Sequence, residues 1–354
     1  MTDAAGFDDA QVLIQGSPEL DDAWVCTLAR ERFGIDGEMK PLTGERDRNY
    51  RLATADGARY MLKVSHPAET ALVADFQTQA LLHLARVDAS LPVQRIVPAR
   101  DGAPSLLCDP GDGRQRVVRV FTYLPGLPLP EAPRTPLQQQ NLARMLARLD
   151  LALQGFDHPA GDLPLPWDVQ RADSVRGLLA HIAEPARRAL AERALDRFVQ
   201  QGKPVLRTLP AQPIHNDFNI YNVLVDAADT DRIAAILDFG DMVRAPAIDD
   251  LAVAAAYQMG TGDDPLADIV PFVAAYHAVR PLADAELGVL FTLIAARLAM
   301  VVAISGWRAA RHPENAAYLL RNNPLSWARL EACERVGAEA ATARFRAACA
   351  STEA

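Results

Sequence analysis

Residues 214–225 read IHNDFNIYNVLV, and residues 236–241 read ILDFGD. The apolar parts, 223–225 and 233–237, have the composition of short β-strands, and the polar residues 226–231 between them predict a turn. A hairpin of this kind holds the polar residues at its open end side by side. We therefore predict that Asp217 and Asn222 lie close to Asp238.

The residue types at this predicted hairpin end are those that phosphoryl transfer needs. A carboxylate must orient the acceptor hydroxyl, and hard oxygen ligands must hold Mg²⁺ against the phosphates. We assign Asp217 to the first role, and Asn222 and Asp238 to the second. Gly240 permits the close backbone turn that aims Asp238 inward. The alternative is a pair of capped loops with solvated acids, which we disfavour because H-x-D-x-x-x-x-N followed by D-F-G is a specific pattern.

His215 precedes the predicted catalytic acid, and two roles are open to it. The preferred one is structural: the imidazole braces the loop by hydrogen bonding and by packing on Phe239. The other is direct chemistry, so His215 is also a candidate catalytic residue.

Outward from the hairpin, the two halves of the chain differ in their periodicity. Residues 38–43, 50–54, 59–64, 93–99 and 115–124 read as strands, with a hairpin turn at Asp56-Gly57. One long helical pattern follows Pro67, with Leu72, Phe76 and Leu81 on it. Beyond residue 136 the chain is mostly helical, with patterns at 137–153, 248–259, 282–304 and 316–332. The predicted class is α+β: a small antiparallel β lobe with one helix, then a large helical lobe.

The predicted domain boundaries follow from this change. Residues 1–36 form an N-terminal helical segment, in which Asp21 and Asp22 cap a helix that ends at Gly34. Residues 37–125 form the β-rich lobe and 126–354 the helical lobe. The proline-rich stretch 125–136 is the natural connection between them.

Composition narrows the classes of function. The formal net charge of −9 argues against broad nucleic-acid or anionic-membrane binding, because both need a basic face. The most apolar segment, 287–304, contains Arg297 and reads as a buried helix rather than a membrane span. The four cysteines are scattered, which predicts neither a zinc site nor a disulfide framework. The N-terminus lacks the pattern of a signal peptide, so a cytoplasmic protein is expected, either a monomer or a homodimer.

Several motifs together resemble one family. They are GERDRNY at 44–50, FTYLPG at 121–126, LD at 149–150 with FDHP at 156–159, and ILDFGDM at 236–242. With the H-x-D-x-x-x-x-N pattern they resemble the aminoglycoside and choline phosphotransferases of the protein-kinase-like superfamily, from about residue 37 to the end. The resemblance is greatest to the hydroxylysine kinase-like members and more distant to homoserine kinase. It implies a bilobal fold and an enzyme that uses ATP or GTP with Mg²⁺ to phosphorylate an alcohol group.

The resemblance also implies a role for Lys63. This lysine alternates out of an apolar strand, so its amine can reach the α- and β-phosphates of a nucleotide and serve catalysis. The usual partner is a Glu on the following helix. The best-aligned position here is Gln77, with Asp75 and Glu69 as nearby acids, so the partner stays open.

The remaining nucleotide contacts are expected in two places. Residues 44–49 stand where a glycine-rich loop would cover the phosphates, which makes Gly44, Arg46 or Arg48, and Asn49 candidate contacts. A charged hairpin turn without that role is the alternative. Purine binding is expected near Phe121, Tyr123 and Leu124, with Leu237 opposite, although Tyr123 reads equally well as core.

On the acceptor side, the resemblance suggests an amino alcohol or a hydroxy amino acid. Asp241 is a candidate ammonium contact or a third group near the metal, and Arg297 either binds a substrate carboxylate or forms a structural ion pair. Asp249 and Asp250 could also contact the substrate, but we prefer to read them as caps of the helix that follows. Tyr257 and Trp307 read as core residues.

Two other classes compete with a small-molecule kinase. A catalytically silent nucleotide-binding module on the same fold is favoured only by Gln77 and by the missing glycine-rich loop. A protein kinase is disfavoured because no A-P-E element follows 236–241. Hydroxylysine, homoserine, choline or ethanolamine, and an aminoglycoside all remain possible acceptors.

Overall fold

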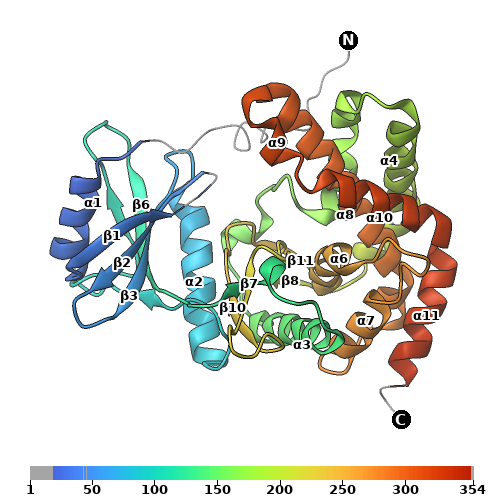
Figure 1. Cartoon of the computed structure of the whole chain (residues 1–354), viewed down its shortest axis with the longest axis horizontal. Helices are drawn as coiled ribbons and strands as arrows, with labels where there is room; N and C mark the ends of the chain where they lie inside the picture. The colour runs from blue at the N-terminus through green and yellow to red at the C-terminus, as the bar shows by residue number, and fades with distance from the viewer. Residues whose placement is uncertain (1–18, 43, 45, 352–354) are drawn as a thin grey trace.

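In the computed structural model, which describes residues 19–42, 44 and 46–351, an antiparallel sheet with two flanking helices stands beside a larger, mainly helical part (Figure 1). This arrangement confirms the predicted α+β class, a small β part with a helix followed by a mainly helical part.

The N-terminal sheet contains six antiparallel strands in the order β1-β2-β3-β6-β4, with β5 also paired to β6. The strands are β1 (Gly37–Leu42), β2 (Arg48–Thr54), β3 (Arg59–Val64), β4 (Ile96–Val97), β5 (Leu106–Cys108) and β6 (Arg116–Thr122). The predicted turn between β2 and β3 is confirmed. Gly57 in this turn has a positive φ of 87°, a conformation that glycine tolerates.

The two faces of this sheet are covered by different helices. Helix α1 (Asp22–Leu28) begins at its N-cap Asp21, continues as a π-helical turn (Ala29–Phe33) and ends at Gly34, as predicted. Helix α2 (Ala71–Val87) begins at its N-cap Thr70. Because side chains alternate along a strand, Val118 and Val120 of β6 pack in the α1 core, whereas Phe121 packs in the core that includes α2.

The predicted strand at 93–99 is mostly wrong. Only Ile96–Val97 pairs with β6, because Pro92 and Pro98 lie on either side and proline cannot donate a ladder hydrogen bond.

The helical part is built around one apolar helix, α8 (Asp284–Arg311), which packs against α4, α6, α10 and α11. Its other helices are α3 (Pro136–Leu153), α4 (Pro185–Arg197), α5 (Lys203–Leu206), α6 (Ala247–Gln258), α7 (Ile269–His277), α9 (Ala316–Leu319), α10 (Asn323–Val336) and α11 (Ala338–Ala350). Helix α8 is long and apolar enough to cross a membrane, but 94% of its most apolar window is buried inside the protein. It is a core helix, as predicted.

The single helix predicted over 316–332 is wrong. It is two helices, α9 and α10, separated at residues 320–322. Pro324 lies in the first turn of α10, and a proline has no N–H to donate to the carbonyl four residues earlier, here that of Leu320, so one continuous helix is broken there.

Two small sheets carry the predicted catalytic segments. Strands β7 (Leu127–Pro128), β9 (Val223–Val225) and β10 (Ile233–Ile236) form one, and β8 (Ala211–Ile214) and β11 (Val243–Pro246) form the other. Residues 215–222 connect β8 to β9, and residues 237–242 connect β10 to β11. The predicted β9–β10 hairpin is confirmed. The β8–β11 ladder, which was not predicted, holds the other ends of the same two loops.

Candidate active site

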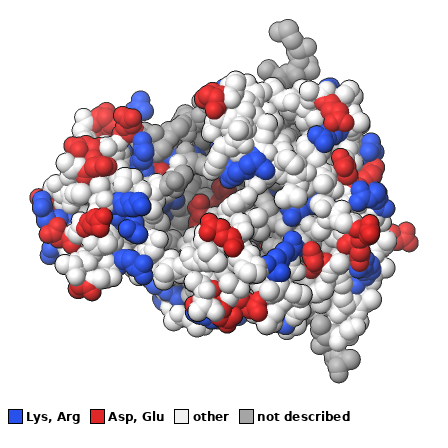
Figure 2. Space-filling view, viewed as in Figure 1, with Lys and Arg blue, Asp and Glu red and all other residues white. Residues whose placement is uncertain are grey.

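A cavity of about 490 Å³ lies between the β-rich part and the helical part. Figure 2 shows acidic side chains within this hollow. From the β-rich side the cavity is lined by Lys63 and by residues before and at the start of β2, namely Gly44, Arg46, Asp47 and Asn49. From the helical side it is lined by Asp217, Asn222, Asp238, Asp241 and Arg297. A volume of this order is typical of small-molecule sites. The structure thus brings together predicted residues from segments far apart in the sequence.

Both carboxylate oxygens of Asp217 have partners. Arg297 Nη2 lies 3.2 Å from Oδ1, and Asn222 Nδ2 donates to Oδ2 at 2.7 Å. Burial raises the pKa of Asp217 to about 6, and the charge of Arg297 opposes this shift. The carboxylate is therefore fixed in direction and placed at the wall of the cavity.

A buried acid holds the backbone of this loop. Asp250 accepts hydrogen bonds from the backbone N–H groups of His215 at 2.8 Å and Asn216 at 2.7 Å. The expectation that Asp249 and Asp250 cap α6 is wrong, because Pro246 occupies the N-cap position and neither acid caps it. Both acids lie in the first turn of α6 and are fully buried, and the Asp250 carboxylate points toward the loop.

His215 is a brace. Its Nε2 lies 2.9 Å from the backbone oxygen of Leu237, its Nδ1 accepts from the Asp217 N–H at 3.3 Å, and its ring meets Phe239 edge to face at 4.8 Å. Both ring nitrogens are engaged and the side chain is fully buried, so direct chemistry does not fit this geometry. The histidine ties the Asp217 loop to the Asp238 loop.

Two residues of these loops have a left-handed backbone. Asn216 has φ 62° and Asp238 has φ 58°, and among the described residues no other non-glycine residue has a positive φ. Asn and Asp tolerate this region better than other side chains, and such strain gathers at functional sites. It turns the side chains that follow β8 and β10 toward the cavity.

Asn222 and Asp238 fit the requirements of a Mg²⁺ site. The amide nitrogen of Asn222 donates to Asp217, which directs its carbonyl oxygen away from that residue. Asp238 is exposed at the cavity, and its Oδ1 accepts the Gly240 N–H at 3.1 Å. A Cβ on Gly240 would lie 2.9 Å from that oxygen, so a larger residue there would require the Asp238 carboxylate to move. Hard oxygen donors of this kind are the ligands Mg²⁺ prefers.

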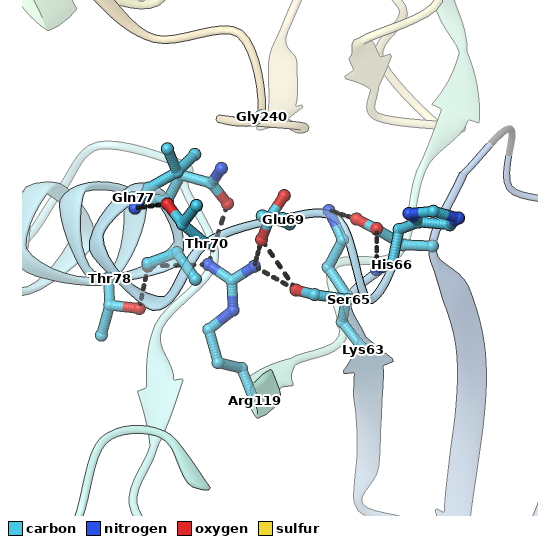
Figure 3. A network of polar contacts seen from close by, with 12 residues as sticks. Lys63, Ser65, His66, Glu69, Thr70, Gln77, Thr78, Arg119 and Gly240 are labelled. Carbon is cyan, nitrogen blue, oxygen red and sulfur yellow. Dashed lines mark hydrogen bonds and ion pairs between the residues drawn. The ribbon is translucent and has the colours of Figure 1, made fainter. Parts of the chain in front are cut away.

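Lys63 is paired with Asp47, and none of the three predicted partners holds it. The Nζ of Lys63 lies 2.8 Å from Asp47 Oδ2. Of the expected partners, Gln77 and Glu69 both bind Arg119, at 2.8 Å and 3.3 Å. Figure 3 shows Arg119 reaching the start of α2, with Lys63 beyond Ser65.

The third expected partner, Asp75, also lies away from Lys63. Its Oδ2 lies 3.2 Å from His158 Nε2. All three residues expected to pair with Lys63 therefore have other partners.

The other expected nucleotide residues fall into two groups. Gly44, Arg46 and Asn49 line the cavity, and a Cβ on Gly44 would lie 2.6 Å from the backbone oxygen of Asp47. By contrast, none of Phe121, Tyr123, Leu124 and Leu237 lines this cavity.

Phe121 does not fit a base contact. Its ring is core, and its strand lies between β3 and β4, so its backbone belongs to the sheet. Tyr123 gives its N–H to Arg59 O at 3.2 Å, and its ring lies 5.5 Å from the Arg59 guanidinium. Base contacts by Leu124 and Leu237 stay predictions.

On the acceptor side, Asp241 lines the cavity. Burial, with the charges of Asp217 and Asp238, raises its pKa to about 7. Arg297 forms an ion pair, and the partner is Asp217 itself; its Nη1 also donates to Trp167 O at 2.9 Å. Tyr257, expected in the core, packs against the core and also lines the cavity, whereas Trp307 is buried.

The sequence was compared with known proteins. Residues 38–287 match the model of the phosphotransferase enzyme family (APH), which is more than half of the chain. The chain belongs to this phosphotransferase family. It is a small-molecule kinase that acts on hydroxyl groups, and kinases of this family use a nucleotide with a divalent metal.

Among its relatives, this phosphotransferase is 25% identical to mouse (Mus musculus) hydroxylysine kinase over 96% of this chain and 95% of that protein. It is 28% identical to the zebrafish (Danio rerio) hydroxylysine kinase over 86% and 89%. Among solved structures, a microcompartment-associated aminopropanol kinase is similar with a TM-score of 0.65, covering 87% of this chain and 100% of that one at 23% identity. The structural likeness supports the fold.

Several cavity residues of this phosphotransferase were missed from the sequence. Asp47 lies within the GERDRNY motif, but only its neighbours were predicted to contact the nucleotide. Trp167, Tyr221, Arg308 and Arg321 also line the cavity. They come from loops and from helix ends, and no local pattern distinguishes such residues from ordinary surface or core.

Proposed function

We propose that this kinase transfers the γ-phosphoryl group of ATP or GTP to the hydroxyl of a small amino alcohol or hydroxy amino acid, similar to hydroxylysine. The observation that carries the proposal is the shared cavity, in which Lys63 and Arg46 face Asp217, Asn222 and Asp238. The cations of Lys63 and Arg46 suit the nucleotide phosphates, and the oxygen donors of Asp217, Asn222 and Asp238 suit a metal ion and a hydroxylated amine.

On the nucleotide side, Lys63 would hold the α- and β-phosphates, and Arg46, which precedes β2, would add a second cation. Asn222 and Asp238 would hold Mg²⁺, which supplies charge neutralisation for the phosphates when bound. With phosphates positioned from both walls, the barrier falls mainly through orientation and electrostatic stabilisation.

On the acceptor side, Asp217 would accept a hydrogen bond from the reacting hydroxyl and orient its oxygen toward the γ-phosphorus. Arg297 and Asn222 each hold one oxygen of Asp217, so the direction of its remaining lone pairs is set before the acceptor arrives. Such preorganisation reduces the entropy lost on reaching the transition state.

The chemistry of the cavity supports an ammonium-bearing acceptor. Asp241 lies beside Asp217 and Asp238, and the aromatic rings of Trp167 and Tyr257 line the same space. Carboxylates and aromatic faces both attract an ammonium group. The curated relatives are hydroxylysine kinases, which is consistent with this class.

A substrate carboxylate would need a different arginine from the one predicted. Arg297 is engaged with Asp217 and Trp167. Arg308 and Arg321 line the same cavity, so a hydroxy amino acid would meet cations there.

The test is a transfer assay with a panel of acceptors: hydroxylysine, homoserine, ethanolamine, choline and an aminoglycoside, each with MgATP and with MgGTP. ADP or GDP release and ³¹P NMR of the product are both read. The proposal predicts transfer to at least one amino alcohol or hydroxy amino acid. Nucleotide binding without transfer to any of them would favour a silent module, and preferred transfer to the aminoglycoside would contradict the proposed acceptor class.

A further inference from the structure

Asp47 uses both of its carboxylate oxygens on the segment that carries Lys63. Oδ2 pairs with the Lys63 ammonium at 2.8 Å, and Oδ1 accepts the backbone N–H of His66 at 2.9 Å. The two side chains are only 14% and 12% exposed. A carboxylate anchored at two points loses little further entropy in holding the amine, so this pair is better defined than an exposed surface ion pair.

The usual place for the lysine's partner is occupied by a different network. Lys63 of β3 and Arg119 of β6 are register partners, so their side chains leave the same face of the sheet. Arg119 Nη1 donates to Gln77 Oε1 at 2.8 Å and to Ala74 O at 3.1 Å, and its Nη2 lies 3.3 Å from Glu69. An acid at position 77 would therefore meet Arg119 first (Figure 3).

We infer that Asp47, which directly precedes β2, is the positioning residue of Lys63, and that it replaces the helix glutamate expected on α2. This inference deepens the proposed function, because it rests on Lys63 as the residue that holds the nucleotide phosphates. An ammonium group has three donors, so the pair with Asp47 leaves donors for the phosphates.

With Asp47 as the partner, the attachment of helix α2 to the sheet and the positioning of Lys63 depend on different residues, whereas a single lysine–glutamate pair would serve both purposes. Helix α2 is held to the sheet through Arg119 and its partners, whatever Lys63 does. The position of Lys63 depends instead on Asp47, which lines the cavity together with Gly44, Arg46 and Asn49. Nucleotide affinity should therefore respond to changes at Asp47 more than to changes in α2.

The charges around Lys63 give the inference a measurable consequence. Burial lowers the pKa of the Lys63 amine, whereas the charges of Asp47 and then of Asp238 raise it, and the net pKa lies above its usual value. Arg119 lowers this pKa and Glu69 raises it, as smaller effects. Without the Asp47 charge, burial and Arg119 act against the ammonium form, so the pKa of Lys63 falls.

The experiment is acylation of the nucleotide-free protein by an amine-reactive ester at several values between pH 7 and 10, with peptide mass spectrometry as the readout. The chain has three lysines, Lys40, Lys63 and Lys203, so the exposed Lys40 is an internal reference in every sample. Asp47→Asn should accelerate acylation of Lys63 relative to Lys40 by about tenfold for each unit by which the pKa falls. A second variant, Asp47→Ser, covers the case in which the first does not fold.

Two control variants make the comparison specific. Asp75→Asn makes the same chemical change on α2 and should leave the Lys63 profile unchanged, because Asp75 contacts His158. In the double variant Asp47→Asn with Gln77→Glu, the new acid should bind Arg119 and should not restore the wild-type profile. Restoration, or an Asp47→Asn profile within about twofold of wild type, would overturn the inference.

Increased access to Lys63 is separable from a lowered pKa. Greater access multiplies the acylation rate by the same factor at every pH, including the plateau above the pKa, in the same way for Asp47→Asn and for the charge-conserving Asp47→Glu. A lowered pKa moves the plateau of the curve to lower pH in Asp47→Asn and Asp47→Ser alone. A uniform increase in all three variants would overturn the inference.

Failure of the proposed function would look different. MgATP should protect Lys63 of the wild-type protein from acylation, and Asp47→Asn should raise the KM for MgATP more than it lowers kcat. If MgATP gives no protection, the phosphate-binding role of Lys63 fails, while the acylation profiles of the nucleotide-free variants still decide the role of Asp47.

Discussion

The guanidinium of Arg297 lies 3.2 Å from the carboxylate of Asp217, and these two residues come from a core helix and from the loop after β8. The side chain of Arg297 is 2% exposed and that of Asp217 is 20% exposed, so the pair joins the protein interior to the cavity wall. The guanidinium also lies 5.0 Å from the ring centre of Trp167. A buried pair of this kind is sensitive to the loss of either partner.

Substitution of Arg297 should therefore impair turnover more than nucleotide binding. Arg297→Gln removes the charge and the fork that hold Asp217 Oδ1 and Trp167 O, and we expect kcat to fall by about 100-fold, as for a displaced catalytic group. Arg297→Lys keeps the charge but cannot make both contacts, so its kcat should lie between those of wild type and Arg297→Gln. Steady-state kinetics and MgATP titration check this. Equal losses in kcat and in nucleotide affinity would contradict it.

Asp238 should control the metal-dependent part of nucleotide binding. Asp238→Asn is the appropriate variant because Asn tolerates the positive φ of 58° better than Ala does. Loss of the carboxylate should reduce affinity for ATP in the presence of Mg²⁺ by at least about tenfold and leave metal-free binding nearly unchanged. Calorimetric titrations with Mg²⁺ and with a chelator measure both. Asp229→Ala, in the exposed turn between β9 and β10, is the control, and an equal effect of both variants would refute the assignment.

Asp249 should make the stability of the protein depend on pH. Both of its carboxylate oxygens are buried without a hydrogen-bond partner among the described residues. Burial, followed by the charges of Asp168 and Asp250, raises the pKa of Asp249 well above its usual value of 3.8. The folded state then retains a proton that the unfolded state has released, so this residue's contribution to stability falls as pH rises from about 4 toward the folded-state pKa.

Asp249→Asn removes this titration. The free energy of unfolding of the variant, relative to wild type, should increase from pH 5 to pH 8, by up to about 1.4 kcal/mol per pH unit within the window. Urea unfolding at the two pH values is the measurement, with the exposed Asp229→Asn as control. The same difference at both pH values would show that Asp249 titrates normally.

The sequence predicted the local elements of this fold better than the contacts between them. The turn at Asp56-Gly57 and the end of the first helix at Gly34 are local backbone effects, so they could be read directly. The strand predicted at 93–99 and the helix predicted at 316–332 are wrong because their apolar patterns continue across prolines, which cannot donate the hydrogen bonds that a strand ladder or a helix interior needs.

The same division holds for the site. The spacing of Asp217, Asn222 and Asp238 predicted one cluster, because a hairpin fixes their distances. The partner of Lys63 was not predictable in the same way, since it depends on Arg119, which a strand pattern alone does not place under α2. Arg297 was foreseen as a buried arginine in need of a partner, but its contact with Asp217 joins positions 80 residues apart.

The central claim is that Asp217 orients the acceptor hydroxyl for transfer of a phosphoryl group. The direct measurement is single-turnover transfer from MgATP to the best acceptor of the panel by wild type, Asp217→Asn and Asp217→Ala, with MgATP affinity determined on the same samples. We expect both variants to bind MgATP within about threefold of wild type and to transfer at least about 1,000-fold more slowly. Near-normal transfer by either variant would contradict the role of Asp217 and the account of this site.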